Sequence, residues 1–145
     1  MKLFSMILLT FLFAKGCDSE AQNNIENAVV EYTANTRGFY QKIVVQNQTF
    51  SVTKLRNGLD KPMVTKINDT DWKTIVTLFK TIKLDSLPNL KAPTDKRFYD
   101  GAAIANLKVI YKEKTYESAP FDHGTPPAAI EKLVNKINSL VKKEQ

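Results

Sequence analysis

Apolar residues in the first half of the chain alternate with polar ones at the two-residue period of β-strands. Four such runs stand between turn-forming residues, and we predict strands at 29–34, 39–46, 49–55 and 63–67. In the second run, Phe39, Ile43 and Val45 fall on one face of the strand. Short turns join neighbouring runs, so the pattern predicts an antiparallel meander.

The period changes to that of a helix after residue 67. Apolar side chains recur at helical spacing at Trp72, Ile75, Val76, Phe79 and Ile82. Residues 68–70 supply capping oxygens, and Asp71 stands in the first turn, where a negative charge favours the helix dipole. Trp72 is expected in the core rather than in a binding site. A long irregular connection, 83–101, follows, and connections of this length are often functional or mobile.

A second hairpin is predicted from strands at 102–111 and 115–120, which turn around Glu113. A final helix then opens at Thr125-Pro126-Pro127, with Thr125 as its N-cap. Its apolar stripe consists of Ile130, Leu133, Val134, Ile137, Leu140 and Val141. The opposite side carries lysines that we expect to be solvated: Lys132, Lys136 and Lys142.

Both halves of the chain repeat the order of a hairpin followed by an amphipathic helix. The order ββββ-α-ββ-α predicts an α+β fold, in which the two helices pack on one face of an antiparallel sheet. A duplication could have produced this order, and so could the chance recurrence of hairpins and helices. The length suits a single domain, which we predict to span residues 28–145.

The N-terminus has the pattern of an export signal. After a short basic start, Leu3–Ala14 (LFSMILLTFLFA) is almost wholly apolar, but it is too short for a membrane-spanning helix. The only cysteine follows directly, in the stretch AKGC, which resembles the bacterial lipobox. That resemblance implies removal of residues 1–16 as a signal peptide and lipidation of Cys17, with 17–27 as a lipidated polar tether. The alternative is a free thiol in a cleaved or disordered tail.

The form of the lipobox bears on the location of the protein. Lys15 departs from the small or hydroxyl residue usual at its place, as in the looser lipoboxes of Bacteroidota. Acidic residues after the cysteine, here Asp18 and Glu20, resemble surface-export signals in that group, whereas an aspartate there resembles an inner-membrane retention signal in enterobacteria. We expect anchoring through acyl chains at the outer membrane, on its periplasmic face or at the cell surface.

Charge and motifs exclude several classes of function. Removal of Lys2 and Lys15 with the signal peptide lowers the formal net charge from +6 to +4. This mild excess comes mostly from scattered lysines without an arginine-rich run, so nucleic acid is not expected as a partner. The sequence contains no glycine-rich phosphate loop and none of the common metal-binding or nucleophile motifs. We therefore expect no cofactor and no bound metal.

Chemistry-bearing residues gather in two segments, RFYDG (97–101) and FDHG (121–124). If the second hairpin turns at Glu113, Ala103 faces His123, and Asp100 and Asp122 reach the same open end. This end could be a divalent-cation or polar-ligand site, or an edge that binds a partner. Its candidate ligand-binding residues are Arg97, Tyr99, Asp100, Asp122 and His123. The alternative is turn chemistry, in which the carboxylates pair with Arg97 or cap backbone N–H groups.

The three arginines of the chain form a second hypothesis. Arg37 and Arg56 are predicted together at the open end of the first meander, and Arg97 precedes the corresponding end of the second hairpin. If the two hairpins run side by side in the same direction, these guanidinium groups share one rim, which could bind an anionic partner. Alternatively, each pairs with a nearby carboxylate such as Asp60, Asp95 or Asp100.

The pattern YDGA…FDHG followed by two prolines, together with the order of elements, resembles small lipoproteins of Bacteroidota. The resemblance extends over most of residues 28–141 and implies no activity. We expect a non-enzymatic, lipid-anchored domain that binds an envelope protein or an anionic polymer. The alternative is a metal-dependent or acid/base hydrolase that uses Asp100, Asp122 and His123.

Overall fold

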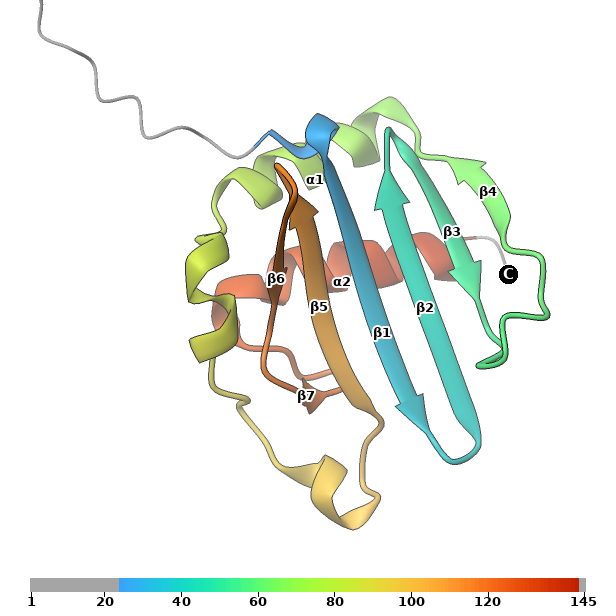
Figure 1. Ribbon diagram of the computed structural model, residues 1–145, viewed down its shortest axis with the longest axis vertical. Coiled ribbons are helices and arrows are strands. Elements are labelled where there is room, and N and C mark those ends of the chain that lie inside the picture. The colour runs from blue at the N-terminus through green and yellow to red at the C-terminus, as the bar shows by residue number, and fades with distance from the viewer. Residues whose placement is uncertain (1–23, 144–145) are drawn as a thin grey trace, which may run out of the picture.

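The computed structural model describes residues 24–143. These residues form an antiparallel sheet with two helices packed on one of its faces (Figure 1). The strands follow the order β4-β3-β2-β1-β5-β6, and the short β7 pairs with β5. The predicted α+β fold class is confirmed, with β7 as an additional strand. The predicted signal peptide and Cys17 lie outside the described residues.

The first four strands form the predicted meander. Their bounds are Ala28–Thr36 (β1), Phe39–Gln46 (β2), Thr49–Thr53 (β3) and Met63–Lys66 (β4). The turn between β2 and β3 uses Asn47 and Gln48, both at positive φ, as a two-residue type I′ hairpin turn requires. Ile43 and Val45 of β2 are both buried, whereas Phe39, which was predicted on their face, is 39% exposed.

The second half contains β5 (Ile104–Tyr111), β6 (Lys114–Glu117) and β7 (Phe121–Asp122). β5 lies beside β1, so the two predicted hairpins form one continuous sheet. The predicted pairing of Ala103 with His123 is confirmed, because the His123 N–H donates to the Ala103 carbonyl at 2.9 Å. One extra residue is accommodated around Pro120, which has no N–H to contribute to a strand ladder.

Helix α1 (Asp69–Lys80) begins as predicted, since the Asn68 side chain accepts a hydrogen bond from the Asp71 N–H at 2.8 Å. The predicted N-cap of the second helix is wrong. Helix α2 (Ala128–Lys142) has Pro127 at its N-cap position, and Thr125 instead forms a β-bridge with Asp122. A residue that precedes a proline avoids the helical conformation, so a helix could not include Pro126.

The connection between α1 and β5 is irregular, as predicted, but part of it belongs to the core. It contains two short 3-10 helices, η2 (Leu84–Asn89) and η3 (Lys96–Tyr99), and both Leu84 and Leu87 of η2 are buried. A further 3-10 helix, η1 (Ile25–Asn27), precedes β1 and buries Ile25. The predicted tether boundary at residue 27 is therefore too late, because Ile25 is already packed into the domain.

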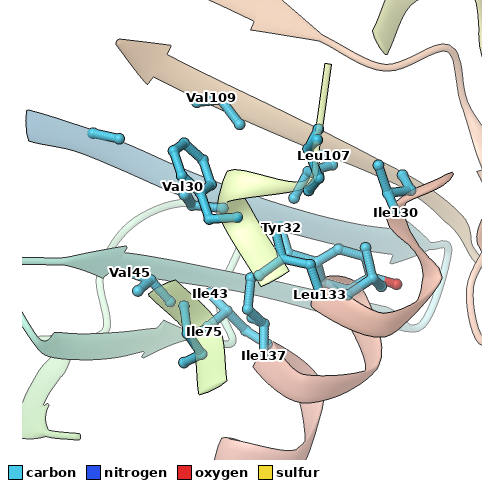
Figure 2. Packing of buried hydrophobic residues seen from close by; sticks show 14 of the residues in the cluster. Val30, Tyr32, Ile43, Val45, Ile75, Leu107, Val109, Ile130, Leu133 and Ile137 are labelled. Atoms are coloured by element: carbon cyan, nitrogen blue, oxygen red, sulfur yellow. The ribbon is translucent and has the colours of Figure 1, made fainter. Parts of the chain in front are cut away.

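The core lies between the sheet and the two helices (Figure 2). Its fully buried side chains come from strands and helices alike, among them Val30, Tyr32, Ile43, Leu107, Ile75, Phe79, Ile130, Leu133 and Ile137. Trp72 packs against this cluster and is partly buried, as the helical stripe predicts. No helix among residues 24–143 is long and apolar enough to cross a membrane.

The two helices are also joined by ion pairs at Asp71, which is buried. Its carboxylate accepts hydrogen bonds from Lys136 Nζ at 2.5 Å and from Lys143 Nζ at 2.7 Å. These bonds, with one from Asn68, hold the pKa of Asp71 far below its usual value. The expectation that Lys136 is freely solvated is therefore wrong, because a carboxylate of the neighbouring helix lies within its reach.

Candidate functional site

Asp122, the last residue of β7, anchors the connection that precedes β5. Its buried carboxylate accepts hydrogen bonds from Thr94 Oγ1 at 2.5 Å and from the Lys96 N–H at 2.8 Å. The backbone N–H and the guanidinium Nη1 of Arg97 each donate to it at 3.1 Å. Four donors thus converge on one side chain, which ties β7 to residues 94–97.

The surroundings of Asp122 set its protonation state. Burial alone would raise its pKa, but the hydrogen bonds from Thr94, Arg97 and Lys96 outweigh burial and lower the pKa to about 2. The carboxylate is therefore ionised at neutral pH and fully occupied by protein donors. This arrangement agrees with the alternative drawn from the sequence, in which a carboxylate pairs with Arg97 and caps backbone N–H groups.

Tyr99 and Asp100 are not among the hydrogen-bond partners of the Asp122 carboxylate, although they closely follow Arg97 in sequence. Both side chains are exposed, and Asp100 ends η3 in the left-handed conformation with φ 60°. Asp100 is thus exposed to solvent, whereas Asp122 is fully buried. Within residues 24–143, no three His, Cys, Asp or Glu side chains are placed to hold a metal ion together.

His123 points to a different environment, on the helical side of the sheet. Its Nδ1 lies 2.7 Å from the hydroxyl oxygen of Tyr32, a buried residue of β1. Burial raises the pKa of Tyr32 to about 12, more than a hydrogen bond with Asn138 lowers it, so the phenol stays protonated. Burial and the charge of Lys142 lower the pKa of His123, so the ring is neutral at pH 7. A neutral ring that accepts the Tyr32 proton at Nδ1 carries its own proton on Nε2.

A groove of about 500 Å³ opens beside His123, where the beginning of β2 and the β7–α2 loop meet the second half of α2. The Phe39 ring forms one wall, with its centre 5.7 Å from that of the imidazole. Two other lining residues bond to each other, since Gln41 Nε2 donates to Asn138 Oδ1 at 3.2 Å. The lining also includes Lys142 and contains no Asp or Glu side chain.

The three arginines are not equivalent. Arg37 and Arg56 line a second, shallower hollow at the end of the sheet where β1 turns into β2. Arg97 is engaged by Asp122, and only 10% of its side chain is exposed. The hypothesis of one rim with three available guanidinium groups is therefore wrong for Arg97, whose charge is used inside the fold.

Among the residues that line the groove, only His123 was a sequence candidate, and Phe39, Gln41, Asn138 and Lys142 were not. Tyr32, which contacts His123, was also not a candidate. Gln41 does carry a signal in the sequence, because it is a polar residue on the strand face of Phe39 and Ile43. Asn138 likewise stands one position after the buried Ile137, at the margin of the apolar stripe. Their convergence depends on how α2 crosses the sheet.

The groove has the features of a small-ligand site: a concave shape, an aromatic wall and a few polar groups that converge. Its polar atoms suit hydrogen bonding, and its single charged side chain, Lys142, favours a neutral or anionic guest. Comparisons of the chain with protein-family models, curated proteins and solved structures find no match.

Proposed function

We propose that this protein is a lipid-anchored domain of the cell envelope that binds a ligand in the groove at His123. The observation that carries the proposal is the groove, because its volume of about 500 Å³ suits a small molecule or one segment of a polymer. Binding requires no catalytic group, and the groove residues have no nucleophile activated by a base.

The chemistry of the lining indicates the kind of ligand. Phe39 offers an apolar face, while Gln41, Asn138 and the His123 imidazole offer hydrogen bonds. No carboxylate is available to attract a cation, and Lys142 adds a positive charge. A sugar or a short peptide with hydroxyl, amide or carboxylate groups fits this combination.

The hydrolase alternative finds less support. It needs Asp100, Asp122 and His123 to act on one substrate, but four protein donors occupy Asp122 and the pKa of that residue is lowered to about 2. An acid or base in catalysis works best with a pKa near the operating pH. His123 would have to act without either carboxylate.

The position of the groove is compatible with an anchor at Cys17. The described chain begins beside the β5–β6 turn, where the Asn24 N–H donates to the Tyr111 hydroxyl at 3.3 Å. The groove residues Phe39 and His123 lie toward the other end of the strands, near the β1–β2 turn (Figure 1). A domain tethered at its N-terminal end would leave this groove accessible.

Phe39→Ala is expected to weaken ligand binding at least tenfold, since the ring forms one wall of the groove. His123 is the only histidine, so its imidazole NMR signals report on the groove without ambiguity. We would titrate the protein with muropeptides, neutral oligosaccharides and short peptides. Phe98→Ala is the matched control, because Phe98 is an exposed aromatic residue outside the groove. If no probe shifts the imidazole signals, or if both variants bind equally well, the groove is not the site.

Cys17→Ser is expected to release the protein from membranes, because a hydroxyl cannot accept the diacylglyceryl group as a thioether. Two or three acyl chains make anchoring stable, since each buried CH₂ contributes about 0.8 kcal/mol. The measurement is the partition of the full-length chain between membrane and soluble fractions of bacteria that lipidate it. A serine variant that remains as detergent-dependent as the wild type would contradict the anchor.

A further inference from the structure

A second hollow, of about 290 Å³, lies where the β1–β2 turn meets the segment that follows β3. Three of its lining residues are cationic: Arg37 comes from the turn, and Lys54 and Arg56 come from the opposite segment. No Asp or Glu side chain lines it. Positive charge from two separate loops is thus gathered around one concave surface.

Arg56 is held in place without a carboxylate partner. Its Nη2 donates to the Thr36 carbonyl at 2.8 Å, and its guanidinium carbon lies 6.0 Å from the centre of the Tyr40 ring. A guanidinium has five N–H groups, so most of its donors are still available to a ligand. A side chain that is already ordered loses less conformational entropy when it binds.

The charges around this hollow are not neutralised inside the described part of the fold. Other cations of the domain form ion pairs, for example Lys108 with Glu31 and Lys136 with Asp71. Within residues 24–143, by contrast, Arg37, Lys54 and Arg56 make no ion pair with a carboxylate.

Asp60 belongs to the same loop as Lys54 and Arg56, and its carboxylate accepts hydrogen bonds from backbone N–H groups instead of pairing with the three cations. Its Oδ2 accepts hydrogen bonds from the N–H groups of Lys54 at 2.6 Å and Leu55 at 3.1 Å. This carboxylate shapes the segment that presents Lys54 and Arg56, and among residues 24–143 neither side chain forms an ion pair with it.

We propose that the hollow formed by Arg37, Lys54 and Arg56 binds a phosphate group. Two arginine forks match the oxygens of a phosphate, and three positive charges suit a group with more than one negative charge. The inference goes beyond the groove at His123 and depends neither on it nor on the lipid anchor. Phe39 lines both hollows, so the phosphate site and the groove adjoin at this residue.

Calorimetric titration of the full-length chain in detergent with inorganic pyrophosphate tests the proposal. We expect saturable binding that weakens at least tenfold in Arg37→Gln and also weakens as salt rises. The Arg37 side chain makes no hydrogen bond or ion pair with other described residues, so its loss should leave the fold intact. Lys91→Gln is the matched control, since it removes one positive charge from an exposed position outside the hollow.

A parallel titration with phosphatidylglycerol vesicles identifies the source of the phosphate. Vesicle binding without pyrophosphate binding, lost in Arg37→Gln, would support the site and assign the phosphate to a lipid headgroup. The absence of saturable binding to either probe, or an equal loss in Lys91→Gln, would overturn the proposal. Neither failure would alter the imidazole signals of His123, so the groove is tested separately.

Discussion

Asp122→Ala is expected to lower the free energy of unfolding by about 3–5 kcal/mol, because it breaks a buried ion pair from one side. The carboxylate serves four donors, two of which are backbone N–H groups that would lose their acceptor. The side chain of Arg97, only 10% exposed, would keep its charge without this buried partner. Urea unfolding measures the loss, with the midpoint and the slope fitted separately.

The matched control for this variant is Asp95→Ala. Asp95 Oδ1 lies 3.5 Å from the same guanidinium nitrogen, but 72% of its side chain is exposed. An exposed ion pair contributes less than about 1 kcal/mol, so this variant should unfold almost like the wild type. Equal losses in the two variants would show that Asp122 does not anchor the connection.

Asp122 also makes stability depend on pH in a defined direction. Its folded-state pKa of about 2 lies below the ordinary value of 3.8, so its contribution is complete above the ordinary value. The contribution is lost as the pH falls from about 4 through about 2. Asp71 adds a loss of the same sign, because its pKa is also lowered. Asp122→Asn should therefore lose less stability than the wild type over this acid range.

The parts of the fold that were predictable from sequence depend on local signals. Alternation of polar and apolar residues located the strands. The turn at Lys112 and Glu113, both at positive φ, together with one extra residue around Pro120, sets the pairing of Ala103 with His123. The start of α2 was missed because two signals competed. Thr125 is a good capping residue, but the consecutive prolines moved the helix start to Ala128.

The site was harder to predict because neighbours in sequence point to different places. Successive residues of an extended chain face opposite sides, so Asp122 reaches Arg97 while His123 reaches Tyr32. The contact of Asp122 with residues 94–97 depends on the path of an irregular connection, for which the sequence has no periodic signal. The hypothesis that Asp122 and His123 act together in one site is therefore wrong, because the two side chains point in different directions.

Contacts between elements that are distant in sequence could not be predicted from local sequence patterns either. Asp71 is well placed for the dipole of its own helix, yet its main partners are Lys136 of α2 and Lys143, the C-cap residue of α2. Gln41 and Asn138 meet only because α2 lies across the beginning of β2. Both contacts arise from the way whole elements pack against each other. The sequence pattern of a single helix or strand carries no information about that packing.

Leu133→Ala and Ile137→Ala are each expected to lower the free energy of unfolding by about 2–5 kcal/mol. Both residues are at most 1% exposed, and they lie in the cluster between α2 and the sheet (Figure 2). Each truncation removes buried methyl groups and leaves a cavity, because the neighbouring side chains relax only in part. Urea unfolding of each single variant measures the loss.

Lys132→Ala is the control for these two variants, since Lys132 is an exposed residue of the same helix. Its effect should stay below about 0.5 kcal/mol, as is usual for surface positions. Lys136→Ala should fall between the two classes, because it removes one of the two lysines that neutralise the buried Asp71. Losses of equal size at Lys132, Leu133 and Ile137 would contradict the packing of α2. Only a helix that does not pack against the sheet would lose the same stability from substitutions on its polar face and on its apolar face.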